Sequence, residues 1–170
     1  LPVRLTTLAR AFSAAPLLLG AFASLGAQAT IPGAPPAQVH VATGDARSYF
    51  TNSWWIESAE GIVLIDAMCL RSDVARLIAT LRATGKPLAA VIITHPHADH
   101  FGGLRQLKEA FPRTPIVATR PTADAMQGVH DQALQPGGWL AALGSDYERR
   151  LQRPDSLVPS GSTLRLAGLT

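Results

Sequence analysis

The order of hydrophobic and polar positions predicts that the first ordered part of the chain is β-structure. Residues 38–43 and 49–56 are rich in β-branched and aromatic side chains, and Gly44-Asp45 between them supplies a turn. An antiparallel pair of strands is therefore expected. Residues 62–65 form an unbroken apolar run, which is typical of a strand buried on both faces.

A helical pattern follows and leads into a second buried strand. Ser72 is a plausible N-cap, and apolar residues then recur at helical spacing from Val74 to Leu81, until Gly85-Lys86-Pro87 ends the element. Residues 88–93 are again an uninterrupted apolar run. Because a strand, a helix and a strand with a short return form a right-handed βαβ unit, the two buried strands should lie parallel in one sheet.

The rest of the chain continues in the same alternating manner. The pattern predicts three further helices and two further strands, the helices at 104–111, 121–135 and 139–151 and the strands at 115–119 and 161–170. The helix at 121–135 has proline in its first turn, where the missing N–H does no harm. The predicted class is α/β, a mixed sheet with flanking helices.

The first 29 residues differ from the remainder and predict a secretory signal peptide. Arg4 and Arg10 are their only charges, an apolar stretch follows, and Ala27-Gln28-Ala29 matches a cleavage site. The apolar stretch is broken by proline and is short for a membrane span of about 20 residues, so no stable membrane anchor is expected after cleavage. Residues 30–37 are a Pro/Gly-rich leader. The mature protein would be exported, to the periplasm or beyond, with its domain at 38–170.

The charge and the cysteine content argue against nucleic-acid binding and against an internal disulfide. Removing the predicted signal peptide lowers the net charge from +3 to +1, since 13 basic residues then face 12 acidic ones. No cluster of basic residues is interleaved with aromatics, so nucleic acid is not an expected partner. The single cysteine, Cys69, excludes an internal disulfide within these residues and is interpreted as a small buried hydrophobe.

The strongest chemical feature directly follows the second buried strand. His95, His97, Asp99 and His100 place four common zinc-ligating side chains within six residues. Residues i and i+2 of an extended segment point to the same side, so His95 and His97 can bind one ion. If a helix starts after His97, Asp99 and His100 face a point a few ångströms away, which suits a site for two metals. In open α/β sheets, ligands bind at this end of the strands.

A histidine that binds no metal is usually a core or surface side chain whose hydrogen bonds are satisfied. We prefer this interpretation for His40 and His130. It fits the cluster poorly, because several desolvated imidazoles beside a carboxylate are costly without a metal. Gly102-Gly103 would let the backbone pass close to the metals, and Thr94 would orient a ligand by hydrogen bonding. Zinc is favoured, although imidazole and carboxylate also suit iron.

Two segments resemble the metallo-β-lactamase superfamily. Residues 94–103 read T-H-x-H-x-D-H-x-G-G, which is similar to the signature of that family, and residues 63–66 resemble its strand that ends in a buried aspartate. The order of elements over residues 38–170 agrees with the resemblance. It implies the first half of an αββα fold, in which two similar halves pack together.

The resemblance also implies roles for particular residues. His95 and His97 would bind a first zinc ion, and Asp99 and His100 a second, while Asp66 would support the ligands from outside the coordination sphere. The implied activity is hydrolysis of an ester, an amide of the β-lactam kind or a thioester of a small molecule, by attack of metal-bound hydroxide. Asp99 would orient that nucleophile.

The sequence departs from the family in the ligands that a second half would supply. A further histidine for each zinc and a bridging carboxylate or thiolate are not identifiable, and His130, Asp146 and Asp155 are substitutes by residue type only. We therefore expect the N-terminal part of a longer enzyme, inactive as 170 residues alone. An iron-dependent oxidoreductase on the same fold and a catalytically incomplete fragment remain as alternatives. Neither the substrate nor the oligomeric state is indicated.

Overall fold

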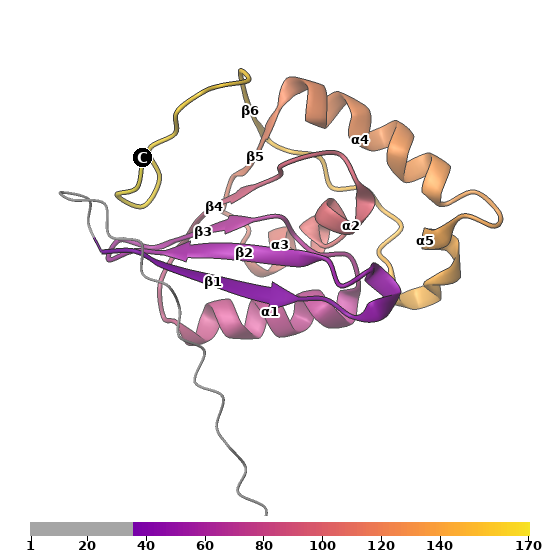
Figure 1. The fold of residues 1–170 in the computed structure, drawn as a ribbon, viewed down its shortest axis with the longest axis horizontal. Helices are drawn as coiled ribbons and strands as arrows, with labels where there is room; N and C mark the ends of the chain where they lie inside the picture. The colour runs from indigo at the N-terminus through magenta and orange to yellow at the C-terminus, as the bar shows by residue number, and fades with distance from the viewer. Residues whose placement is uncertain (1–35) are drawn as a thin grey trace, which may run out of the picture.

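The computed structural model describes residues 36–170 (Figure 1). The predicted signal peptide and nearly all of the predicted leader lie outside the described residues. Within residues 36–170, none of the helices combines the length and the apolar character that crossing a membrane requires.

Six strands form one mixed sheet in which the order in space follows the order in the chain. The strands are β1 (Gln38–Thr43), β2 (Asn52–Glu57), β3 (Ile62–Ile65), β4 (Leu88–Ile92), β5 (Ile116–Thr119) and β6 (Ser156–Val158). The strands β1, β2 and β3 pair antiparallel, and β3 to β6 pair parallel. The predicted N-terminal hairpin and the predicted parallel pair of β3 and β4 are both confirmed.

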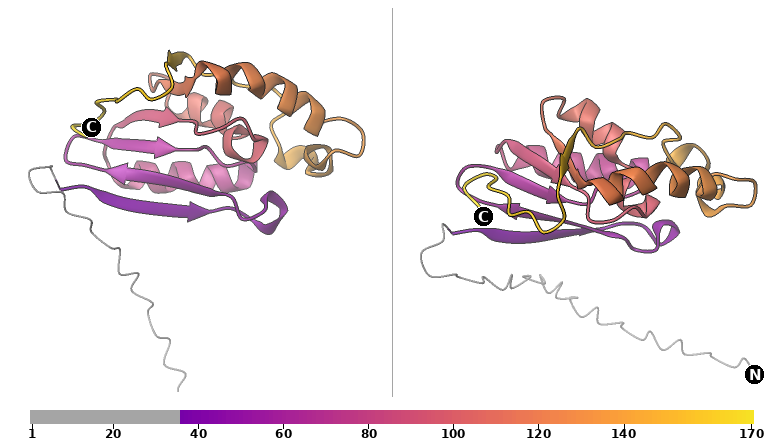
Figure 2. Two further views of the ribbon diagram at one scale, coloured as in Figure 1. Left: turned by 45° about the horizontal axis from the view of Figure 1, so that its top comes forward. Right: turned by 90° about the horizontal axis from the view of Figure 1, so that it is seen from above.

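Helices connect the parallel strands and lie on one face of the sheet (Figure 2). They are α1 (Arg71–Ala83), α2 (Ala98–Phe101), α3 (Leu104–Ala110), α4 (Arg120–Ala133) and α5 (Trp139–Ala142), with short 3-10 turns η1 (Ala46–Ser48) and η2 (Gly144–Asp146). Helix α4 starts as predicted, with Pro121 in its first turn and the Thr119 hydroxyl accepting a hydrogen bond from the Thr122 N–H.

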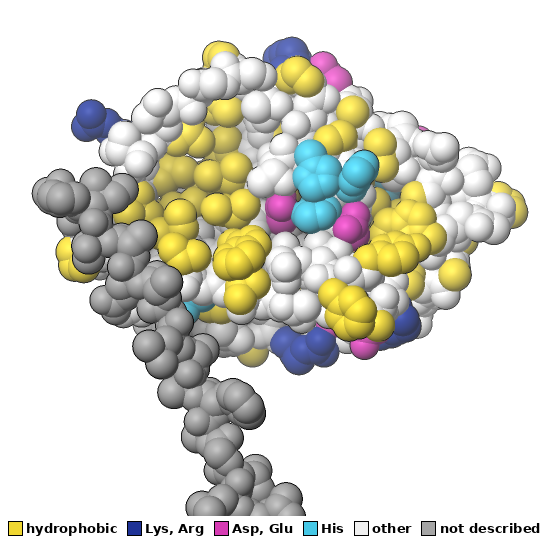
Figure 3. Space-filling view, viewed as in Figure 1, with side chains coloured by type: hydrophobic (Ala, Val, Ile, Leu, Met, Phe, Trp, Pro, Cys, Tyr) yellow, Lys and Arg dark blue, Asp and Glu magenta, His cyan; other side chains and the backbone are white. Residues whose placement is uncertain are grey.

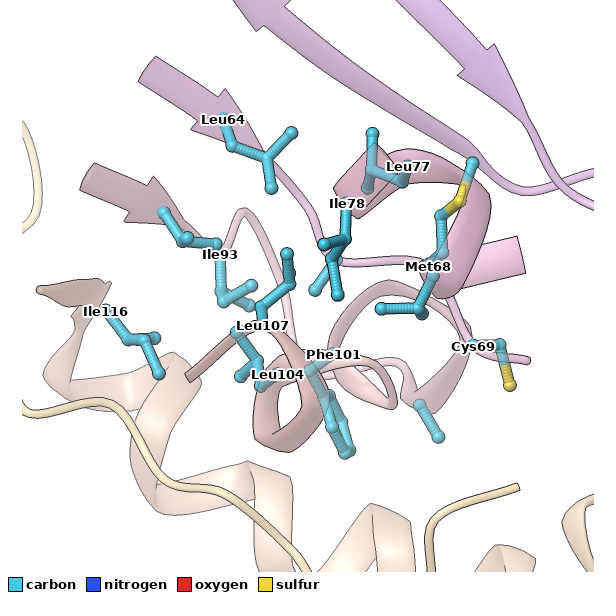
Figure 4. Close-up of a cluster of buried hydrophobic side chains, with 14 of the residues drawn as sticks. Leu64, Met68, Cys69, Leu77, Ile78, Ile93, Phe101, Leu104, Leu107 and Ile116 are labelled. Atoms are coloured by element: carbon cyan, nitrogen blue, oxygen red, sulfur yellow. The ribbon is translucent and has the colours of Figure 1, made fainter. Parts of the chain in front are cut away.

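One core lies between the helices and the sheet (Figure 4). Helix α1 contributes Val74, Leu77, Ile78 and Leu81, the apolar positions that the sequence spaced for one helical face. They pack in the same cluster as Leu64 of β3 and as residues of α3 and α4. Truncating one of these side chains, as in Leu77→Ala, is expected to cost about 2–5 kcal/mol of stability.

The opposite face of the sheet carries no helix among the described residues and is apolar. Ser53 and Trp55 of β2 point to the core, whereas Trp54 between them is 43% exposed. Trp54 pairs with Val41 on one side and with Ile65 on the other, so these three side chains share the open face. Figure 3 looks onto this face and shows hydrophobic side chains spread beside the histidine cluster.

Two predictions about where elements begin are wrong. The second strand starts at Asn52, because Tyr49 and Phe50 have φ of 57° and 55°, which no strand residue adopts. Helix α1 begins two residues earlier than expected, with Leu70 at the N-cap instead of Ser72. The Ser72 hydroxyl lies inside the helix and donates to Asp146 instead.

The C-terminal third also differs from the prediction. The helix expected over 139–151 stops at Ala142, since Gly144 turns left-handed at φ 61° and Tyr147 becomes extended to bridge Leu70. No strand forms over 161–170, where only an isolated bridge joins Leu166 and Leu169. The three-residue β6 was not predicted; the Asp155 carboxylate accepts a hydrogen bond from the Ile116 N–H and holds it against β5.

Candidate metal centre

The histidine motif lies in the loop between β4 and α2 and in the first turn of α2. His95 and His97 precede the helix, whereas Asp99 and His100 belong to it. The ring centroid of His95 lies 4.7 Å from that of His97 and 4.2 Å from that of His100. All three imidazoles therefore gather at one point, at the carboxyl end of a parallel strand, and Figure 3 shows them as a single cluster with acidic side chains beside it.

Asp66 brings the end of β3 to this cluster. Its backbone is left-handed at φ 63°, a conformation that aspartate tolerates better than most residues. The buried carboxylate accepts hydrogen bonds from the backbone N–H of Thr94 at 2.9 Å and from the Thr94 hydroxyl. The same carboxylate lies 2.9 Å from Nδ1 of His100. Because β3 and β4 are neighbours, a strained turn after one strand reaches the motif that follows the other.

The contact between Asp66 and His100 sets the state of the imidazole. A carboxylate can only accept, so Nδ1 of His100 carries a hydrogen and Nε2 is left for a ligand. The hydrogen bond to Asp66 raises the pKa of His100 above its usual value, although partial burial opposes the change. Burial lowers the pKa of His95, and the nearby His100 and His97 lower it further. His95 is thus held in the neutral form that metals bind.

The donor atoms fit a metal ion in number and in kind. One ligating atom each of Asp66, His95 and His100 lies within 4.8 Å of the other two. Asp99 adds a carboxylate whose Oδ2 is 3.4 Å from Nε2 of His100, and His97 is exposed at the edge of the cluster. Imidazole nitrogens with carboxylate oxygens suit zinc, and iron as well.

The three residues considered as substitute ligands lie outside the cluster. Asp146 accepts from the Ser72 N–H and hydroxyl, which fastens η2 to the start of α1. Asp155 pairs with Lys108 at 2.7 Å. His130 is buried within α4, where its Nδ1 lies 3.4 Å from a carboxylate oxygen of Asp131.

Other side chains near the motif are structural. His40 stacks on Trp55 with ring centroids 4.9 Å apart, away from the cluster. Cys69 is buried as expected, and burial raises the pKa of its thiol to about 12. One contact escaped the sequence reasoning altogether: the Thr51 hydroxyl lies 2.6 Å from Oδ2 of Asp99.

Comparison with known proteins identifies the family. The model of the metallo-beta-lactamase superfamily matches residues 46–166 of the chain. The chain belongs to this superfamily. The match includes both β3 with Asp66 and the whole histidine motif, so the resemblance carried by these two segments is confirmed.

Curated relatives match the sequence of this chain over part of their length. The protein YobT of Bacillus subtilis is 27% identical over 114 residues, which are 66% of this chain and 48% of YobT. A hydroxyacylglutathione hydrolase of Alkalilimnicola ehrlichii is 38% identical over 82 residues, covering 48% of this chain and 31% of the enzyme. The chain thus spans about half or less of the length of these relatives.

Solved structures show the same fold at low identity. The BLEG-1 B3 metallo-beta-lactamase superposes with a TM-score of 0.56 at 17% identity, over 76% of this chain and 56% of that one. A metallo-beta-lactamase from Pontibacter korlensis gives a TM-score of 0.52 at 20% identity, over 83% and 56%. The predicted α/β class, a mixed sheet with flanking helices as in one part of the metallo-beta-lactamase fold, is confirmed.

Proposed function

We propose that this chain provides part of the metal site of a zinc-dependent hydrolase. The observation that carries the proposal is the convergence of His95 and His100 donor atoms within 4.8 Å, beside the Asp66 carboxylate that orients His100, at the end of parallel strands where ligands bind. His97 and Asp99 adjoin this point from the same loop and helix. Membership of a superfamily that includes hydrolases supports hydrolysis over other reactions of the same ligands.

Each residue of the cluster has a part in this proposal. His95 and His97 would hold one zinc ion, and Asp99 and His100 a second. Bound zinc lowers the pKa of water to about 7 and acts as a Lewis acid on the substrate oxygen. Asp66 holds the His100 imidazole in the tautomer that presents Nε2, and Thr94 holds Asp66.

Asp99 is the residue proposed to act on the nucleophile. Its Oδ2 is occupied by the Thr51 hydroxyl, whereas its Oδ1 has no hydrogen bond among the described residues. We propose that this carboxylate, held by the Thr51 hydroxyl, orients the attacking water beside the metal. Removing this carboxylate would therefore affect both metal binding and the chemical step.

The proposed substrate is a small molecule with an ester, thioester or β-lactam-like amide bond. Relatives named hydroxyacylglutathione hydrolases support a thioester, and fold neighbours named metallo-beta-lactamases keep a β-lactam among the substrates to test. We also propose export, because of the signal peptide predicted at residues 1–29. Sequencing the N-terminus of the mature protein tests the second point, and a first residue before position 27 would contradict it.

The central test is metal dependence of the full-length protein. Purified protein should contain zinc by elemental analysis, and should lose hydrolysis of the three substrate classes when a chelator removes the metal and regain it with added zinc. Turnover that survives complete metal removal would contradict the proposal. Purified protein that contains iron instead of zinc and turns over none of the three substrate classes would instead favour the iron oxidoreductase.

A pair of histidine variants links the metal to the site. His97→Gln should lower the zinc content and the activity, with little cost in folding because the side chain is exposed. His40→Gln makes the same change outside the cluster and should leave both unchanged. Equal zinc content in the two variants would show that the metal binds elsewhere.

A further inference from the structure

Thr51 is the last residue of the loop between β1 and β2, and its side chain contacts the candidate metal centre. The residue is only 6% exposed, and its hydroxyl lies 2.6 Å from Oδ2 of Asp99. We propose that Thr51 is a positioning residue that fixes the Asp99 carboxylate for metal binding, and that the loop of residues 44–51, here called the Thr51 arm, is built for this purpose. The inference rests on the proposed function.

The Thr51 arm is held in a conformation that its sequence does not prefer. Tyr49 and Phe50 are consecutive left-handed residues with large side chains, an arrangement that persists only where the surroundings determine it. The N–H of Gly44 donates to the carbonyl of Thr51 at 2.9 Å and closes the loop. The N–H of Thr51 donates to the carbonyl of Ser48 at 3.1 Å. These bonds fix the backbone of Thr51 at both of its polar groups.

A buried carboxylate fastens the arm to helix α1. Asp73 is only 2% exposed, and its Oδ2 accepts from the N–H of Asp45 at 2.9 Å, while the nearby Ser48 hydroxyl donates to the Asp45 carbonyl at 2.9 Å. Arg76 pairs with the other oxygen of Asp73. Space at the anchor is tight, because a Cβ on Gly44 would lie 2.8 Å from Oγ of Ser48. The buried residues of the arm, Gly44, Ser48 and Thr51, are therefore part of the packed fold, and the exposed Tyr49 and Phe50 lie between them.

The Thr51 hydroxyl has one hydrogen and two acceptors within reach. Besides Oδ2 of Asp99, the carbonyl of Ser48 lies 2.7 Å away. An Asp99 carboxylate that binds a metal is ionised and can only accept, so the hydrogen goes to Asp99, while the Ser48 carbonyl keeps the N–H of Thr51. This bond holds Oδ2, the oxygen that lies 3.4 Å from Nε2 of His100, and so fixes the rotation of the carboxylate beside that ligand.

The test compares the zinc affinities of the full-length protein and two variants at this position. Thr51→Val keeps the shape and removes the hydroxyl, and it should weaken binding of the zinc ion at Asp99 and His100 by roughly 10- to 100-fold, the usual effect of losing a hydrogen bond to a metal ligand. Thr51→Ser keeps the hydroxyl and should bind like the wild type. Competition with a chromophoric chelator measures affinity, and the visible spectrum of the cobalt-substituted protein reports ligand geometry.

Thr114→Val is the matched control for folding. The Thr114 hydroxyl is also buried and donates to a backbone carbonyl, that of Leu88, at 2.8 Å, but it is remote from the cluster. This variant should bind zinc like the wild type. Wild-type affinity in Thr51→Val, equal weakening in Thr51→Ser, or equal weakening in Thr114→Val would each overturn the inference. Wild-type protein that binds no metal would instead overturn the proposed function, before any variant is compared.

Discussion

Gly103 allows a test of how closely the histidine motif packs against the loop after β3 and against helix α1. It lies between α2 and α3 with ordinary helical φ of −81°, so alanine would suffer no backbone penalty there. A Cβ at this position would nevertheless lie 2.1 Å from the carbonyl oxygen of Ala67 and 2.4 Å from Cγ2 of Val74. The first of these neighbours is backbone and cannot rotate away. Gly103→Ala must therefore separate α3 from the loop after β3.

The size of that separation sets the expected cost. Ordinary contact begins near 3.4 Å, so the Ala67 oxygen and the new Cβ must move apart by about 1.3 Å. Overpacking of this kind costs about 1–3 kcal/mol, and two simultaneous overlaps place the loss of unfolding free energy near 3 kcal/mol. The movement also strains the 3.0 Å bond from the Gly103 N–H to Met68 and the 2.6 Å bond from the Ala67 N–H to His100. Zinc affinity should fall with stability.

Gly128→Ala is the matched control, because the chemical change is the same and the surroundings are open. Gly128 is exposed within α4, and a Cβ there would meet no atom within 4 Å. Alanine should stabilise this helix position by about 0.5–1 kcal/mol. Urea unfolding of both variants gives the comparison. Gly103→Ala within 0.5 kcal/mol of the wild type, or Gly128→Ala as destabilised as Gly103→Ala, would refute the steric argument.

Three further predictions follow from single contacts. Asp66→Asn should weaken zinc binding roughly 10- to 100-fold by loosening His100, and chelator competition at unchanged affinity would contradict this. Burial alone would raise the pKa of Asp146, but hydrogen bonds from Ser72 hold it below its usual value; its stabilising effect is therefore full above about pH 4 and is lost in acid. Asp146→Asn should accordingly be less stable than the wild type by about 1 kcal/mol at pH 6 in urea unfolding, and the difference should shrink as the pH falls below about 4, whereas a constant difference would contradict the assignment. Cys69 should react with thiol reagents at pH 8 only once denaturant exposes it, and rapid labelling of native protein would contradict its burial.

The parts of the fold that the sequence predicts are those decided by contiguous residues. The apolar run of β3, the helical spacing of α1 and the apolar run of β4 each identify an element without reference to any other. Their parallel pairing then follows from the chirality of the βαβ connection. The helix predicted at 139–151 failed because Gly144 breaks the pattern at one residue, and β6 was missed because its three residues become a strand only by pairing with β5.

The candidate site divides in the same way. His95, His97, Asp99 and His100 are recognisable because the four donors stand within six residues, and the loop and first helical turn that carry them bring them together locally. Thr51 is 48 residues away from the Asp99 that it contacts. Its position depends on the left-handed backbone of Tyr49 and Phe50, whereas the sequence pattern predicts that both residues belong to a strand.

Local sequence therefore predicts which atoms are available to a metal, whereas their orientation depends on distant parts of the chain. Asp66 acts on His100 across the β3 and β4 register, and Thr51 acts on Asp99 through an arm fastened to α1. The first contact leaves Nε2 of His100 for a metal, and the second fixes the rotation of the Asp99 carboxylate. If this division holds, altering a motif residue should remove a ligand and lower the zinc content, whereas altering Asp66 or Thr51 should weaken zinc binding roughly 10- to 100-fold while all four motif residues stay in place.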